Sequence, residues 1–224
     1  MTILLPDDHT GFPDPSLAGP DGLLAVGGRL EPETLIMAYS KGIFPWYGKR
    51  SPLLWWSPDP RMILYPRKLA VSKSLRQSIR NRNYRVRFDT AFDEVIARCA
   101  GIRRKHEQGT WITPEIIRTY TGLHEMGLAH SVETFENNRL AGGLYGVSLG
   151  KAFFGESMFH VARDASKVAL FYLVNRLLEW DFHFIDAQVE TLHMRSMGAE
   201  MIPRVEFLEL LDQALAEPTI RGKW

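Results

Sequence analysis

Apolar residues recur at helical spacing in several segments after about residue 60. Predicted helices follow Ser72 and Thr90, and another runs from Thr113–Pro114 to Gly127; a strand, YRVRFD, lies between the first two. Serine, threonine and proline are typical of helix starts, and glycine is typical of helix ends. This part of the chain therefore predicts a mixture of helices and strands.

The next segment changes to the pattern of an antiparallel meander. Three apolar stretches, HSVETFE, RLAGGLYGVSLG and KAFFGESMF, are separated by turn residues at Asn137–Asn138 and Gly150. A long helix is predicted over Ala165–Trp180, and its apolar residues cover most of its circumference, so it should be largely buried. The strand FHFIDAQ, a helix near Met194 and a last helix over residues 203–216 complete the chain.

The first 62 residues have a different composition, which predicts a small N-terminal α+β domain before a larger domain over residues 63–224. They are rich in Pro and Gly and contain one clear helix, with Pro32 near its first turn and Gly42 beyond its end. The segment GIFPWYGKRSPLLWWSPDPR places four aromatic residues among prolines. One of these rings is a candidate for stacking on a nucleobase, although core packing explains such residues equally well.

The order of meander, buried helix and strand is similar to the acetyltransferase-like (GNAT) fold. In that fold two neighbouring parallel strands splay apart, and here the cleft would open between FFGESMF and FIDAQ. A glycine-rich turn usually holds the pyrophosphate of coenzyme A at the start of the following helix. The corresponding connection here, HVARDASK, has no glycine and carries Asp164, which predicts an acyl carrier other than coenzyme A.

Bulk properties limit the classes of function. The chain has 224 residues, 45% hydrophobic and 24% charged, with no apolar run long enough for a membrane span and no signal peptide, so we expect a cytoplasmic protein without a membrane partner. Its single cysteine, Cys99, has apolar neighbours and is interpreted as a core residue. Nothing in the sequence indicates more than a monomer.

Positive charge is concentrated in one segment, although the whole chain has a net charge of only +1. Thirteen basic residues lie between positions 61 and 105 against three acidic ones, a local excess of ten. Such an excess favours binding of a polyanion through phosphate contacts, and the alternative is a solvated basic face that aids solubility. The thirteen are Arg61, Arg67, Lys68, Lys73, Arg76, Arg80, Arg82, Arg85, Arg87, Arg98, Arg103, Arg104 and Lys105.

Nine stretches, in order between about Phe12 and Pro203, resemble those of the leucyl/phenylalanyl-tRNA protein transferases. They are GLLAVGGRL, MAYSKGIFPWY, LWWSPDPR, GTWIT, AHSVE, GGLYGV, FFGESMF, ASKVAL and IDAQV. The resemblance implies that Leu or Phe, and less efficiently Met, is transferred from aminoacyl-tRNA to proteins that begin with Arg or Lys, in the bacterial N-end-rule pathway. It also implies a small N-terminal domain and an acetyltransferase-like second domain. From the residues themselves, which include no metal-ligand spacing and no glycine-rich turn for coenzyme A, we expect no metal and no cofactor.

Asp186 and Gln188 lie two apart on a predicted strand, so their side chains should share the face that lines the cleft. The resemblance implies that both are catalytic and serve the attacking amine, the carboxylate receiving its proton through or beside the glutamine. An ordinary aspartate is a weak base, so orienting the amine and stabilising its charge is an equal alternative. A purely structural role at the end of the strand is the third.

Glu156, inside an apolar strand, is the expected partner for the basic side chain of the acceptor peptide, together with Asp186. A buried carboxylate requires a partner, which bound guanidinium would supply; a permanent internal base or amide is the alternative. The donor side chain requires an apolar pocket, for which we select Leu144, Phe153, Met158, Leu170, Leu173 and Ile185. Related transferases often carry methionine and phenylalanine at positions 144 and 173, which leaves the preference between Leu and Phe open.

The remaining candidates concern the tRNA. Trp46 and Trp111 are selected to grip the 3′-terminal adenosine. The basic patch selected for the acceptor stem is Lys73, Arg76, Arg80, Arg82 and Arg85, which would position the tRNA without reading its sequence.

Histidines show no spacing typical of metal ligands, and His130, His183 and His193 are interpreted as core or strand-end residues, with His193 close to the site strand. Two other functions are alternatives. A coenzyme A-dependent acetyltransferase is disfavoured by the connection without glycine, and an RNA-binding module without chemistry is disfavoured by the acidic residues in the cleft.

Overall fold

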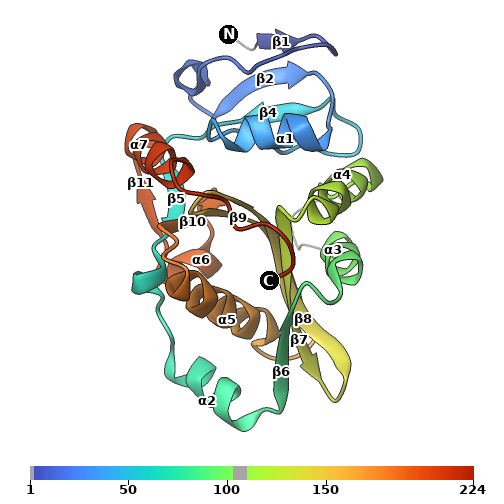
Figure 1. Cartoon of the computed structure of the whole chain (residues 1–224), viewed down its shortest axis with the longest axis vertical. Helices are drawn as coiled ribbons and strands as arrows, with labels where there is room; N and C mark the ends of the chain where they lie inside the picture. The colour runs from blue at the N-terminus through green and yellow to red at the C-terminus, as the bar shows by residue number, and fades with distance from the viewer. Residues whose placement is uncertain (1–2, 103–109) are drawn as a thin grey trace.

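The computed structural model describes residues 3–102 and 110–224 (Figure 1). Arg103, Arg104 and Lys105 of the basic segment lie outside these residues. Two sheets organise the chain: a small one near the N-terminus and a seven-stranded one that carries most of the core. Within the described residues, no helix is long and apolar enough to cross a membrane.

The small sheet has the strand order β1-β2-β4-β3 and consists of short strands. Its bounds are β1 Ile3–Leu5, β2 Leu23–Gly27, β3 Phe44–Pro45 and β4 Leu54–Trp56. The predicted helix, α1 over Pro32–Tyr39, begins at its proline and ends before Gly42, whose φ of 70° is typical of glycine after a helix. Trp55 of β4 is fully buried and donates its indole N–H to the carbonyl of Gly27, so it holds this unit together.

The large sheet has the order β11-β5-β10-β9-β8-β7-β6 and is mixed. The strands not given above are β5 Arg61–Leu64, β6 Tyr84–Phe88, β7 Ala129–Glu136, β8 Arg139–Leu149, β9 Ala152–His160, β10 Phe184–Gln188 and β11 Glu200–Ile202. The predicted meander is confirmed as β7, β8 and β9, with Asn137 and Asn138 in the left-handed turn. Because β5 begins at Arg61, the chain enters this sheet two residues before the predicted domain boundary; the division itself stays a prediction.

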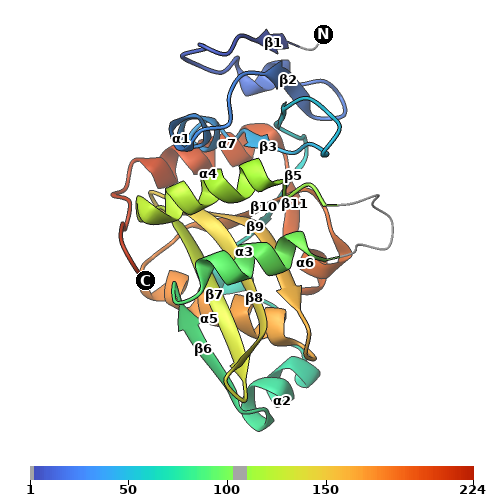
Figure 2. The same ribbon diagram turned by 90° about the vertical axis from the view of Figure 1, so that its right-hand side faces the viewer.

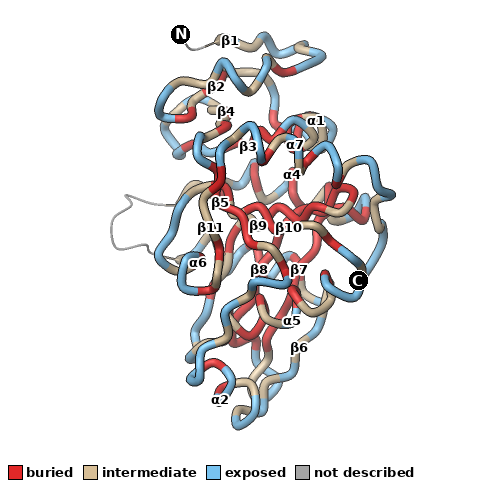
Figure 3. The backbone as a smooth tube through the Cα atoms, turned by 90° about the vertical axis from the view of Figure 1, so that its left-hand side faces the viewer, coloured by how far each residue is buried: buried red, intermediate tan, exposed pale blue. Residues whose placement is uncertain are grey.

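Helices cover both faces of the large sheet (Figure 2). On one face lie α3 (Phe92–Ala100), α4 (Pro114–Glu125) and α7 (Arg204–Leu215), and on the other lies α5 (Ala165–Glu179) with α2 (Lys73–Asn81) and the short α6 (Leu192–Ser196). The prediction of a largely buried helix is confirmed for α5. Cys99 of α3 is buried, as expected. Figure 3 shows the buried backbone concentrated in the central strands.

The feature that positions the site is the divergence of β9 and β10. These strands run parallel and pair at three positions, the last joining Asp186 to Phe154. Beyond it β9 continues alongside β8, while β10 bulges between Asp186 and Gln188 against β5. The α+β architecture with a splayed mixed sheet is therefore the acetyltransferase-like one that the order of elements predicted.

Candidate active site

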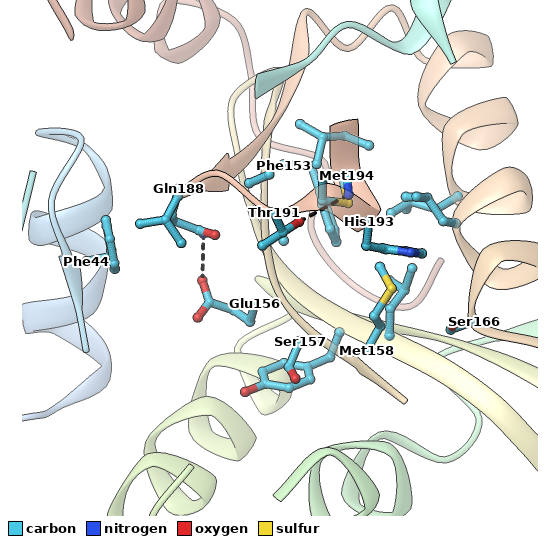
Figure 4. Close-up of a pocket in the computed structure, with 18 of the residues that line it drawn as sticks. Phe44, Phe153, Glu156, Ser157, Met158, Ser166, Gln188, Thr191, His193 and Met194 are labelled. Atoms are coloured by element: carbon cyan, nitrogen blue, oxygen red, sulfur yellow. Dashed lines mark hydrogen bonds between the residues drawn. The ribbon is translucent and has the colours of Figure 1, made fainter. Parts of the chain in front are cut away.

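A cavity of about 580 Å³ opens where β9 and β10 diverge (Figure 4). Its walls include all six residues selected for the donor side chain, namely Leu144, Phe153, Met158, Leu170, Leu173 and Ile185. Trp46 and Trp111 line the same cavity, from the small sheet and from the approach to α4 respectively. Residues distant in sequence and selected for apolar or aromatic character thus converge on one space, although their individual roles stay predictions.

The apolar wall is built by close packing around the sheet. Leu170 and Leu173 lie three residues apart on α5, so they share the helix face that lines the cavity. The ring of Phe153 fills the space above Gly146 of β8, where an added Cβ would lie only 2.5 Å from that ring. An added Cβ would also meet the backbone carbonyl oxygen of Phe154, at 2.2 Å, so a glycine is required here and leaves room for the Phe153 ring as one boundary of the cavity.

Glu156 of β9 projects into the cavity and is the acidic group of the site. Its Oε1 accepts a hydrogen bond from the phenol of Tyr39 at 2.6 Å, and its Oε2 accepts one from Tyr120 at 3.0 Å. The amide Nε2 of Gln188 donates to Oε1 at 3.4 Å. Burial raises the pKa of Glu156 to about 7, against the opposing effect of the two phenols, so its charge changes near neutral pH.

The two tyrosines were not predicted from the sequence. Tyr39 comes from α1 and Tyr120 from α4, and their hydroxyl oxygens also lie within hydrogen-bond distance of each other. Each phenol has a single O–H, so a phenol that donates to Glu156 can only accept from the other. Burial and the Glu156 carboxylate raise the pKa of both phenols well above the usual value, so both remain protonated donors. Both lie on helical faces whose spacing indicates only core packing, and no motif marks them as partners of a carboxylate.

The expectation that Asp186 lines the cleft beside Gln188 is wrong. The bulge after Asp186 breaks the two-residue alternation, and the Asp186 side chain is fully buried in the interior. Its two oxygens accept hydrogen bonds from Nε and Nη2 of Arg61, at 2.8 and 2.7 Å. Arg61, counted among the bases that attract nucleic acid, is likewise fully buried, so the sequence placed it wrongly on the surface.

Gln188 lines the cavity, whereas Asp186 does not. Its backbone has a φ of 58°, a left-handed conformation that costs about 1–3 kcal/mol for residues other than glycine. The Oδ1 of Asp186 accepts the backbone N–H of Gln188 at 2.9 Å, which holds this conformation. The Gln188 side chain consequently faces the cavity and Glu156, as Figure 4 shows.

Histidine and hydroxyl side chains at the other end of the cavity were not selected from the sequence. His160, Ser166, Thr191 and His193 line it there. Burial lowers the pKa of His193, and the charges of Lys167 and His160 lower it further. The sequence analysis interpreted His193 as a core or strand-end residue close to the site strand, and the structure places it half-buried in the wall of the cavity.

The other histidines occupy structural positions. His130 is buried, with Nδ1 2.8 Å from Oδ2 of Asp89, and its ring stacks on Trp224. His183 is half-buried and donates its backbone N–H to the carbonyl of Lys151. Among the residues that the structure describes, no three histidine, cysteine or acidic side chains are grouped as metal ligands.

The connection before α5 has the acidic character that its sequence indicated. Asp164 is the residue that precedes the first turn of α5 and lies in the left-handed region with a φ of 60°. Its carboxylate accepts a hydrogen bond from Ser78 of α2 at 2.7 Å. A negative charge therefore lies at the helix start, where a pyrophosphate would need to bind.

The predicted basic patch is divided between two faces of the large sheet. Lys73, Arg76 and Arg80 are exposed on α2, which packs beside α5 at the end of the molecule far from the small sheet (Figure 1). Arg85 is exposed on β6, where alternation directs it to the opposite face. Arg82 lies between them, paired with Glu136 at 3.0 Å.

Two family models match this chain. The model described as leucyl/phenylalanyl-tRNA protein transferase matches residues 63–212, and that of the N-terminal domain of the same family matches residues 28–59. A curated leucyl/phenylalanyl-tRNA–protein transferase of Anaeromyxobacter sp. (strain Fw109-5) is 59% identical over 224 residues, which is all of this chain and 95% of that protein.

Relatives of the same name from other bacteria are similarly close. That of Desulfatibacillum aliphaticivorans is 54% identical over 95% of this chain and 91% of its own length. That of Maridesulfovibrio salexigens is 56% identical over 95% of this chain and 89% of its own length. The chain is a transferase and belongs to the leucyl/phenylalanyl-tRNA protein transferase family.

Proposed function

We propose that this transferase moves Leu or Phe, and less efficiently Met, from aminoacyl-tRNA to the α-amino group of proteins that begin with Arg or Lys. The product would be marked for degradation by the N-end-rule pathway in the cytoplasm. The observation that carries the proposal is a single cavity with an apolar wall and, beside it, a carboxylate held by two phenols and an amide.

The apolar wall supports an apolar donor side chain. Leu144, Phe153, Leu170, Leu173 and Ile185 are nearly fully buried, so their positions are fixed by packing rather than by the ligand. The 3′-terminal adenosine is assigned to Trp46 and Trp111, which line the same cavity. Trp46 is 38% exposed, and an exposed ring at the edge of a cavity offers a face to a base.

Glu156 is assigned to the acceptor. A guanidinium or ammonium group that enters the cavity stabilises the ionised carboxylate and replaces the water that burial removed. Asp186 contributes a second negative charge behind it, but Arg61 neutralises that charge at 2.7 Å. Direct recognition of the acceptor by Asp186 is therefore no part of the proposal.

The chemistry requires little base catalysis. The acceptor α-amine, with an ordinary pKa of about 7.7–8.0, attacks the ester carbonyl carbon of the donor; a C–N bond forms and the bond to the ribose oxygen breaks. The amine loses one proton, and the departing ribose oxygen gains one. The amide Nε2 of Gln188 donates to Glu156. The amide oxygen of Gln188 is then free to accept a hydrogen bond from the attacking amine and orient it.

Asp186 acts through Gln188 in this proposal. Both of its oxygens are occupied, and its contact with the Gln188 backbone keeps the amide side chain facing the cavity. Positioning of the amine and the ester then supplies most of the acceleration, since effective molarities of about 10⁵–10⁸ M are available from orientation alone.

The test is transfer of labelled phenylalanine from Phe-tRNA to two peptides that differ only in Arg or Ala as first residue, without added metal or coenzyme A. Transfer to the Arg peptide alone is expected. Equal transfer to both peptides would reject the acceptor rule, and tight tRNA binding without transfer would indicate a binding protein. In a separate reaction, labelled acetyl-coenzyme A replaces Phe-tRNA, and transfer of acetyl to either peptide there would instead identify an acetyltransferase.

A further inference from the structure

Arg61 joins parts of the chain that are distant in sequence. It is the first residue of β5, is fully buried, and its guanidinium lies 4.8 Å from the ring centre of Phe44 and 4.5 Å from that of Phe207. Besides the two bonds to Asp186, its Nη1 donates to the carbonyl of Gly42 at 3.1 Å. Arg61 thus contacts α7, β10 and the segment that enters β3.

Each hydrogen-bond partner of Arg61 leads directly to a wall of the cavity. Gly42 is followed closely by Phe44, Pro45 and Trp46, all of which line the cavity on the side of the small sheet. Asp186 holds the backbone of Gln188, which lines the cavity on the side of the large sheet. Arg61 itself does not line the cavity, so any effect on the reaction must pass through these neighbours.

We propose that Arg61 is a positioning residue that sets the Trp46 segment and Gln188 relative to each other; this rests on the proposed function. The bidentate pair with Asp186 ties the guanidinium to the Gln188 side of the cavity, and the hydrogen bond to Gly42 ties it to the Trp46 side. Because the guanidinium is rigid and planar, the three bonds define one geometry between the two walls. A donor bound against Trp46 is thereby placed in line with an amine held by Gln188.

A buried ion pair suits this role. Such pairs contribute little net stability compared with well-packed apolar residues, but they can specify one arrangement among several. Arginine is also required rather than lysine, because a single ammonium cannot reach both Asp186 oxygens and the Gly42 carbonyl in this fork geometry. The conservative variant Arg61→Lys therefore separates charge from geometry.

The experiment compares the full-length wild-type protein with Arg61→Lys, Arg61→Met and the control Arg176→Met. Arg176 is a suitable control because its guanidinium also packs over two rings, Phe88 and Trp180, at 4.6 and 5.0 Å, but it does not line the cavity. Three quantities are measured: hydrogen exchange of the segments 42–46 and 186–189, the single-turnover rate of transfer from Phe-tRNA to the Arg peptide, and the KM for that peptide under multiple turnover.

In Arg61→Lys we expect faster exchange in both segments together and a loss of about 10²-fold in the single-turnover rate at saturating substrates, with little change in KM. Arg61→Met should show the same pattern more strongly, whereas Arg176→Met should show neither effect. Unchanged exchange in either segment, or a wild-type rate despite faster exchange, would overturn the proposal. If the wild-type protein transfers nothing, the proposed function fails, and exchange still decides whether Arg61 couples the two segments.

Discussion

Tyr39 on α1 and Glu156 on β9 are joined by a 2.6 Å hydrogen bond, in which the phenol donates to the carboxylate. The bond spans the two sheets, because α1 belongs to the small N-terminal unit and β9 to the centre of the large sheet. The N-terminal unit therefore supplies a partner to the proposed acceptor site, in addition to the wall that Trp46 forms. Both units must be correctly docked for the site to be complete.

Binding of a basic acceptor should strengthen as pH rises through about 7. The pKa of Glu156 is raised by burial to about 7, so its carboxylate, which the cation requires, is lost below that pH. Affinity for a peptide with Nα-acetylarginine first, which has no titrating α-amine, is measured between pH 5.5 and 8.5. The same peptide with norleucine first is the control, and affinity for the arginine peptide that does not vary with pH would contradict the assignment.

The contribution of Glu156 to the free energy of unfolding should fall as pH rises, whereas its contribution to peptide binding should rise. Because its folded pKa lies above its ordinary value of 4.5, its contribution is fully present below pH 4.5 and is lost as pH rises through about 7. Urea unfolding at several pH values is expected to show this slope in the wild type. The variant Glu156→Gln should reduce it between pH 5 and 8, and an identical slope in both proteins would exclude Glu156 as its source.

Removing the phenol of Tyr39 should shift the titration of Glu156 upward. The hydrogen bond from Tyr39 favours the ionised carboxylate and so opposes the rise in pKa caused by burial. In Tyr39→Phe, the pH midpoint for arginine-peptide binding should therefore rise above that of the wild type, with a loss of about 1–3 kcal/mol in stability. Tyr47→Phe, which removes a phenol bonded to Glu115 instead, is the matched control and should leave the midpoint in place.

The size of the donor pocket should be controlled by α5. Leu173 is almost fully buried and lines the cavity, so Leu173→Phe fills part of the space that the donor side chain requires. We expect kcat/KM for Phe-tRNA to fall relative to Leu-tRNA by about tenfold or more, in the range of 1–3 kcal/mol. Parallel assays with the two charged tRNAs measure this ratio. An equal loss with both donors would indicate damage to packing rather than altered selection.

The two faces of the divided basic patch can be distinguished by salt dependence. Arg76 and Arg80 are exposed on α2, and Arg85 and Arg87 are exposed on the opposite face, so two double alanine variants remove equal charge from different surfaces. Removing one arginine that binds a phosphate should reduce the slope of log K against log salt by about 1. We expect the α2 variant to bind tRNA more weakly and with a shallower slope, because most of the predicted patch lies there. An effect confined to the Arg85 and Arg87 variant would place the tRNA on the other face.

The sequence by itself determined the helices, strands and turns that local patterns of residues specify. Helical spacing and start signals predicted α2 and α4, Asn137–Asn138 predicted the hairpin between β7 and β8, and the order of elements predicted where β9 and β10 diverge. The six apolar residues selected for the donor do line one cavity, because a cavity wall and a core position require the same side chains; their role in binding the donor stays a prediction. The nine matching stretches then indicated the family.

Only the tertiary structure decided which charges are paired and which face the cavity. A single bulge directs the Asp186 side chain into the core and the Gln188 side chain into the cavity. The sequence of this strand alternates regularly and gives no sign of the bulge. In the sequence, Arg61 is indistinguishable from the other bases of its segment. Its pairing with Asp186 follows only from the position of β5 beside β10. Tyr39 and Tyr120 reach Glu156 from positions 117 and 36 residues away, and such contacts depend on the docking of whole elements rather than on any local pattern.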